Sequence, residues 1–220
     1  FFFRKILKER RLNKNWGKIL NAHISQGLRE GIFSFVITIW VYILTQSEFS
    51  LGMFNLFLSG LSFVFYFLAT KFIKEPLRKK AILVGGLMLY LAIYVILFQI
   101  SYVHIIIYAI IIGIAYPIIN VPYVSLTYDV IGKAKEAKEL RVEYIVVREL
   151  FVNLGRVISI GVFLIAVFLY PAEKIIPYLL ATFGIGHLII YFFVKDIHLI
   201  PPPDVDDFEV NDHISNEKSR

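Results

Sequence analysis

Four ionisable side chains lie beside or inside two apolar runs of the sequence. Arg29 and Glu30 stand at the start of the run over 27–46, while Glu149 directly precedes the run over 150–170 and Arg156 lies in it. Charged groups in hydrocarbon are costly, so they pair with one another or face a water-filled cavity. We expect Arg156 to pair with Glu30 or Glu149 and to form a charged gate with Arg29. A static ion pair near the headgroups, or a side chain that extends to the interface, fits the same positions.

Uncharged polar residues follow helical spacing in four of the apolar runs. Steps of three and four residues place them on one face of each helix, where they would form the wall of a substrate cavity. For a single Ser or Thr, helix packing is the stronger interpretation, because small side chains let helices approach closely. The Asn residues favour function, since an amide is harder to desolvate. The candidate cavity residues are Ser34, Thr38, Asn55, Ser59, Tyr116, Asn120 and Asn153.

Catalytic and metal-binding motifs are missing from the sequence. It has no G-x-S-x-G, no phosphate-binding glycine loop and no H-E-x-x-H. It has no Cys, and its five His are scattered. No Asp or Glu lies in the middle of an apolar run, so no proton carrier is visible there. We therefore expect no enzyme activity, no metal and no cofactor.

The elements that would position these side chains are membrane helices. The chain is 58% hydrophobic and 18% charged, with a mean hydropathy of +0.70, whereas soluble domains are roughly 45–50% apolar and about 25% charged. Its apolar residues form runs of about twenty, the length that crosses a bilayer. We predict an all-α membrane protein, a six-transmembrane-helix bundle over 27–196. Its spans are expected near 27–46, 51–70, 81–100, 102–124, 150–170 and 175–194.

Basic residues alternate between the two sides of these predicted spans. Of the 23 Lys and Arg, twenty-two lie in segments that six spans would place on one side, and only Lys174 lies on the other. The positive-inside rule then places both termini in the cytoplasm. The net charge of +6 therefore reflects membrane topology and does not indicate a nucleic-acid partner. We expect the lipid bilayer of a bacterial plasma membrane to be the setting.

The two ends of the chain are expected to lie outside the bundle. Residues 1–26 are interpreted as a cytoplasmic connecting segment, in which Leu12, Trp16 and Ile19 share a helix face suited to an anionic leaflet. A solvated linker is the alternative. Residues 197–220 are expected to be a disordered cytoplasmic tail, because they are rich in Pro and Asp. The apolar start of the chain suggests that an earlier span precedes it.

With these features, the chain resembles the second six-helix repeat of the major facilitator superfamily. In that family the first, second, fourth and fifth helices of each half line the central cavity, and the halves join on the cytoplasmic side. The four runs with polar faces hold the same positions. The basic run over 71–80 stands where the family's Gly-Asp-Gly-Arg-Arg type loop recurs, with the basic cluster present and the glycines and aspartate absent.

The resemblance implies secondary active transport of a small-molecule substrate by alternating access. This chain would be the C-terminal half, and its partners would be a missing N-terminal six-helix half and a coupling ion such as a proton. A membrane-embedded enzyme or a lipid flippase acting on lipid-linked substrates is the alternative function.

Overall fold

The computed structural model describes residues 3–99 and 101–199, and within these residues the secondary structure is helical, with no strand. This confirms the all-α class. The elements are α1 (Phe3–Leu12), α2 (Lys14–Thr45), α3 (Glu48–Phe72), a 3-10 helix η1 (Glu75–Leu77), α4 (Arg78–Phe98), α5 (Tyr102–Gly132), α6 (Arg141–Leu169), α7 (Ala172–Gly184) and α8 (Gly186–Val194).

Polar side chains cap the N-termini of three of the long helices. Asn13 accepts hydrogen bonds from the backbone N–H groups of Asn15 and Trp16 at the start of α2. Ser47 and Ser101 accept in the same way at the starts of α3 and α5. Such caps satisfy N–H groups that have no partner within the helix.

Within residues 3–99 and 101–199, five helical segments are long and apolar enough to cross a membrane, which is compatible with an integral membrane protein. They are Glu48–Phe72, Glu75–Phe98, Tyr102–Gly132, Arg141–Leu169 and Lys174–Val194. The first span expected from the sequence, 27–46, forms the C-terminal part of α2, a helix of 32 residues. The last expected span is divided, because α7 ends at Gly184 and α8 begins at Gly186.

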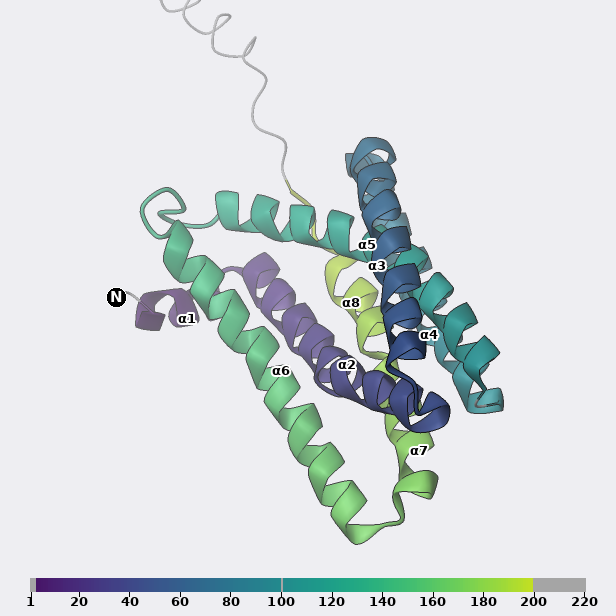
Figure 1. Ribbon diagram of the computed structural model, residues 1–220. Coiled ribbons are helices and arrows are strands. Elements are labelled where there is room, and N and C mark those ends of the chain that lie inside the picture. Colours follow the sequence, from purple (N-terminus) through teal and green to yellow (C-terminus); the bar gives the residue numbers. More distant parts are fainter. Residues whose placement is uncertain (1–2, 100, 200–220) are drawn as a thin grey trace, which may run out of the picture.

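Helix α2 occupies the middle of the bundle and packs mainly against α6 and α8, while α4 packs against α5 and α8 (Figure 1). Glycines allow the closest approach of α2 to α6. A Cβ atom added at Gly27 would lie 2.0 Å from the Val152 carbonyl oxygen, and one at Gly155 would lie 2.3 Å from that of Ile24. Both contacts are far shorter than van der Waals distance, so only glycine fits this crossing.

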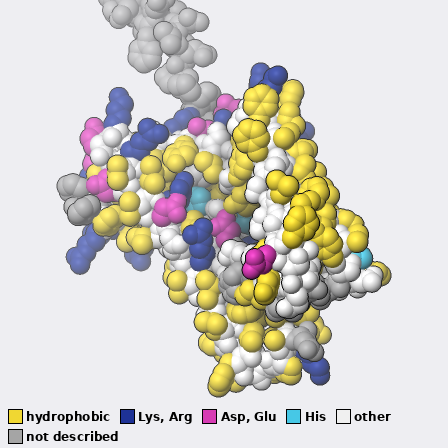
Figure 2. Space-filling model, viewed as in Figure 1, with side chains coloured by type: hydrophobic (Ala, Val, Ile, Leu, Met, Phe, Trp, Pro, Cys, Tyr) yellow, Lys and Arg dark blue, Asp and Glu magenta, His cyan; other side chains and the backbone are white. Residues whose placement is uncertain are grey.

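Charged side chains lie at the end of the molecule that holds two of the connections. The end of α3 and the connection between α5 and α6 lie in the upper part of Figure 1, and Figure 2 shows Lys and Arg side chains there as well as at the left and in the middle of the view. Ion pairs at this end join Lys5 to Glu136 and Arg78 to Asp129. Hydrophobic side chains dominate the opposite end of the same view. The cytoplasmic orientation of the basic end stays a prediction.

The N-terminal segment differs from the expectation. Trp16 and Ile19 are fully buried, and the Trp16 ring packs edge-on against Tyr144 with centroids 5.0 Å apart. This apolar face therefore contacts protein and is not available to a lipid leaflet, while Leu12 is 78% exposed. Helical periodicity marks a face that will be buried, and only the packing decides whether protein or lipid buries it.

The boundary expected for the C-terminal tail is also different. Ile197 is buried in the same core as Trp16, so the packed structure extends beyond α8. Asn15 donates a hydrogen bond to the carbonyl oxygen of His198, 3.4 Å away. The rest of the expected tail, 200–220, lies outside the described residues, as do Phe1 and Phe2.

Candidate functional site

A cavity of about 640 Å³ lies between α2, α3, α5 and α6. Its apolar lining comes from Phe33 and Ile37 of α2, Phe54 and Leu58 of α3, and Ile112 of α5. An apolar wall that carries a few polar groups is typical of small-molecule sites. The polar and charged lining residues are Arg29, Glu30, Ser34, Thr38, Asn55, Ser62, Tyr108, Tyr116 and Arg156.

An ion pair joins α2 to α6 at this cavity. Nη2 of Arg156 lies 2.7 Å from Oε2 of Glu30, whose side chain is 15% exposed. Nη1 of Arg156 donates to Oδ1 of Asn153 at 3.0 Å, and the Tyr116 hydroxyl donates to Oε1 of Glu30 at 3.1 Å. Glu30 therefore holds groups from α5 and α6 together. Its negative charge is balanced by Arg156.

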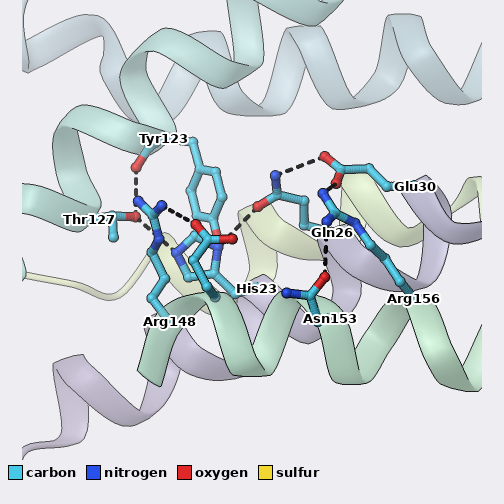
Figure 3. Close-up of polar contacts among 9 residues, drawn as sticks. His23, Gln26, Glu30, Tyr123, Thr127, Arg148, Asn153 and Arg156 are labelled. Atoms are coloured by element: carbon cyan, nitrogen blue, oxygen red, sulfur yellow. Dashed lines mark hydrogen bonds and ion pairs between the residues drawn. The ribbon is translucent and has the colours of Figure 1, made fainter. Parts of the chain in front are cut away.

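A chain of hydrogen bonds continues from Glu30 along α2 (Figure 3). Gln26 donates from Nε2 to Oε1 of Glu30 at 2.8 Å. A carboxylate only accepts, so this contact fixes the Gln26 amide with its oxygen toward Nδ1 of His23, 3.0 Å away. A His23 ring with its proton on Nδ1 can donate to this oxygen. The Glu30 contact thereby assigns the amide orientation, and the Gln26 contact favours the tautomer with the proton on Nδ1.

His23 is buried, and both of its ring nitrogens lie near hydroxyl groups of α5. Its Nδ1 lies 2.8 Å from the Tyr123 hydroxyl, and its Nε2 lies 3.5 Å from Oγ1 of Thr127. His23 is 2% exposed and precedes the apolar part of α2. Burial lowers the pKa of His23 to about 3, and the positive charge of Arg148 acts in the same direction. The ring is therefore neutral at physiological pH.

Arg29 has a different environment, although it lies on the same helix. It is 4% exposed, and its guanidinium carbon lies 4.4 Å from the centroid of the Phe33 ring. Its Nε and Nη2 have no hydrogen-bond partner among the residues that the structure describes. Both oxygens of the adjacent Glu30 already accept hydrogen bonds from other side chains. The cavity thus contains one positive charge that no described carboxylate balances.

The structure brings most of the predicted site residues to one place. Seven of them line the cavity: Ser34, Thr38, Asn55, Tyr116, Arg29, Glu30 and Arg156. Thr38 and Asn55 also bond to backbone oxygens of their own helices. Asn153 reaches the site through Arg156.

Three of the predicted residues lie elsewhere. Ser59 is exposed and is not among the described lining residues. Asn120 lines a second cavity of about 460 Å³ and donates to the Tyr66 hydroxyl at 2.9 Å. Glu149 pairs with its sequence neighbour Arg148, so it does not take part in the Arg156 ion pair.

Sequence reasoning missed the polar chain that begins at His23. Gln26 and His23 lie four and seven positions before Glu30, so they continue the polar face of α2 toward its N-terminus. The same spacing in the sequence would have found them had the polar face been followed beyond the apolar run. Tyr123 and Thr127, which complete the His23 environment from α5, have no comparable sequence signal.

The chain is similar to an uncharacterised protein named YqgE from Bacillus subtilis (strain 168). The two sequences are 52% identical over 197 residues, which cover 90% of this chain and 46% of YqgE. The chain therefore spans about half the length of this relative. No family model matches the chain, and no solved structure matches it.

Proposed function

We propose that this chain is one half of a secondary transporter that moves a small molecule across the membrane by alternating access. The observation that carries the proposal is the cavity between α2, α3, α5 and α6, with the Glu30–Arg156 ion pair in its wall. In such a mechanism two halves rock around a site that lies between them. The ion pair would open and close as the halves move.

Two further observations support a missing half. The apolar stretches of α3 and α6 are only 6% and 17% buried within the chain, and both helices border the cavity. A second set of helices placed against α3 and α6 would cover the cavity and this apolar surface. The relative YqgE is about twice as long as the matched region, which leaves room for such a set.

The arrangement fits the C-terminal half of a major facilitator superfamily transporter in our proposal. The apolar part of α2 would be the first of six spans, followed by the five membrane-length segments. With the basic end in the cytoplasm, both ends of the chain would be cytoplasmic and the membrane would be the bacterial plasma membrane. A proton is the coupling ion we expect.

Alternating access can be tested without a known substrate. Ser34→Cys, in the complete protein with any other Cys replaced, places a thiol on the cavity wall. We expect a membrane-impermeant maleimide to label it from either side of the membrane. Lys135→Cys, in the α5–α6 connection, is the control and should react only from the cytoplasmic side. Labelling of Ser34→Cys from one side only would refute alternating access.

The ion pair can be tested in the same assay. Glu30→Ala or Arg156→Ala removes the contact between α2 and α6, so the balance between the two open states should shift. We expect labelling of Ser34→Cys from the cytoplasm to change at least about threefold, which corresponds to less than 1 kcal/mol. Lys80→Gln, at an exposed position in the first turn of α4, should leave it unchanged. Unchanged labelling in both alanine variants would remove the gate from the proposal.

A further inference from the structure

Arg29 combines burial with an unbalanced charge. It lines the cavity, yet it is 4% exposed and two of its nitrogens lack a partner within the described part of the chain. A guanidinium remains charged in proteins, and a buried charge without a partner is strongly unfavourable. The stacking contact with Phe33 at 4.4 Å offsets only part of this cost. An anion bound at this position would therefore offset the cost of burying the Arg29 charge.

The carboxylate of the neighbouring Glu30 does not pair with Arg29. Glu30 accepts from Gln26, Tyr116 and Arg156, so its oxygens are committed to other donors. With two Arg and one Glu in the described lining, the cavity has a formal charge of +1. Its remaining walls contain aromatic rings and aliphatic side chains, among them Phe33 and Phe54.

We propose that the cavity binds an organic anion whose carboxylate or phosphate group contacts Arg29 and whose apolar body packs against the aromatic walls. This inference deepens the proposed transport function by giving the class of its substrate. A planar guanidinium matches a carboxylate or phosphate with two parallel hydrogen bonds. Nε and Nη2 form that pair of donors, and both are buried in the structure of the empty chain. Binding as proposed therefore requires the guanidinium to turn toward the ligand. The cavity volume of about 640 Å³ accommodates a molecule of metabolite or drug size.

Two sources can supply this chemistry, namely a soluble organic anion and the headgroup of an anionic lipid. The complete protein in phosphatidylcholine nanodiscs is the system for both. The soluble probes are 4-phenylbutyrate and 4-phenylbutyl phosphate. Their matched controls are the neutral 4-phenylbutanamide and the cationic 4-phenylbutylamine, and binding is measured by calorimetry. We expect either anion to bind at least about tenfold more tightly than both controls, because charge-assisted hydrogen bonds to a buried guanidinium contribute more than about 1.4 kcal/mol.

Adding phosphatidylglycerol to the nanodiscs distinguishes the sources. If phosphatidylglycerol competes with the probe, and if Arg29→Met abolishes this competition, the lipid headgroup is an occupant of the site. Probe binding that does not change with phosphatidylglycerol identifies the soluble anion. Either result supports an anion at Arg29. The inference is overturned if neither anion binds at millimolar concentration, or if the amide binds as tightly as the carboxylate.

Variants at Arg29 separate a binding role from a structural one. Arg29→Met keeps the length of the side chain and should weaken anion binding at least about tenfold. Because no described carboxylate balances this charge, the thermal unfolding temperature of the empty protein should not fall. Arg29→Lys should retain the preference for anion over amide, and Lys80→Gln should bind as the wild type does. Undiminished anion binding by Arg29→Met overturns the inference.

The same measurements distinguish this inference from the transport proposal. Anion binding that depends on Arg29, together with labelling of Ser34→Cys from one side only, would keep the site and refute the transporter. Labelling from both sides, together with anion binding that Arg29→Met does not alter, would keep the transporter and refute the substrate class.

Discussion

His23 and Arg29 are two buried polar residues on one helix, six positions apart, and their surroundings are opposite. His23 is 2% exposed, neutral and in contact with Gln26, Tyr123 and Thr127. Arg29 is 4% exposed and charged, and two of its nitrogens have no partner among the residues described. The first environment places three polar side chains around a neutral ring, and the second leaves a charge beside a cavity without a described carboxylate.

The difference distinguishes a buried polar group that has hydrogen-bond partners from a buried charge to which our inference assigns a ligand. A buried, fully hydrogen-bonded network rigidifies a protein, and removal of one member leaves the others unsatisfied. A buried charge without a partner lowers stability, and a fold retains such a group where it has another role. We therefore expect substitutions around His23 to change stability and substitutions at Arg29 to change binding.

The largest effect is expected at the crossing of α2 and α6, because the environments of both His23 and Arg29 depend on this packing. Gly27 lies between His23 and Arg29, and a Cβ atom there would lie 2.0 Å from the Val152 carbonyl oxygen of α6. Gly27→Ala should force α2 and α6 apart and lower the free energy of unfolding by at least about 3 kcal/mol. Chemical unfolding in detergent micelles measures this change.

A second glycine provides the matched control. Gly161 lies on α6 with no atom within 4 Å of its added Cβ position. Gly161→Ala should be neutral or stabilise the protein by about 0.5–1 kcal/mol, because alanine favours a helix. Equal effects of the two substitutions would contradict the close α2–α6 crossing.

A smaller effect sharpens the comparison. His23→Ala leaves Gln26 and Tyr123 without a partner that they have in the folded chain. We expect a loss of roughly 1–3 kcal/mol in the free energy of unfolding, since unsatisfied buried polar groups are costly. Labelling of Ser34→Cys in the folded fraction should not change. If His23→Ala left stability intact while Arg29→Met reduced it, the assignment of the two roles would be reversed.

The smallest effect is the dependence of stability on pH. Burial lowers the pKa of His23 to about 3 in the folded protein, whereas an exposed His has a pKa of about 6.5. Below pH 6.5 the unfolded chain binds a proton that the folded chain does not, so the free energy of unfolding falls as the pH drops. At pH 5.5 the loss in the free energy of unfolding that His23 causes is roughly 1 kcal/mol. The loss from pH 7 to 5.5 should be smaller in His23→Gln, and an equal loss would show that another group is responsible.

Much of the fold could be predicted because the signals are local. Apolar length and helical spacing predicted the long helices, and the polar faces of four runs contain most of the described polar lining of the cavity. The prediction for Trp16 and Ile19 was wrong because an amphipathic face does not say what will cover it. Sequence patterns also did not separate Glu30 from Glu149 as the partner of Arg156, because either carboxylate had a plausible spacing.

The sequence by itself determined the helical class, the membrane-length segments and the separation of basic from apolar stretches, because these depend on hydropathy and on spacing along one chain. Tertiary structure decided which charges meet. Arg156 pairs with Glu30, a residue 126 positions away, because glycines let α2 and α6 approach closely enough for the two side chains to touch. The same packing buries Arg29 without a carboxylate partner among the described residues, since Glu30 faces α5 and α6.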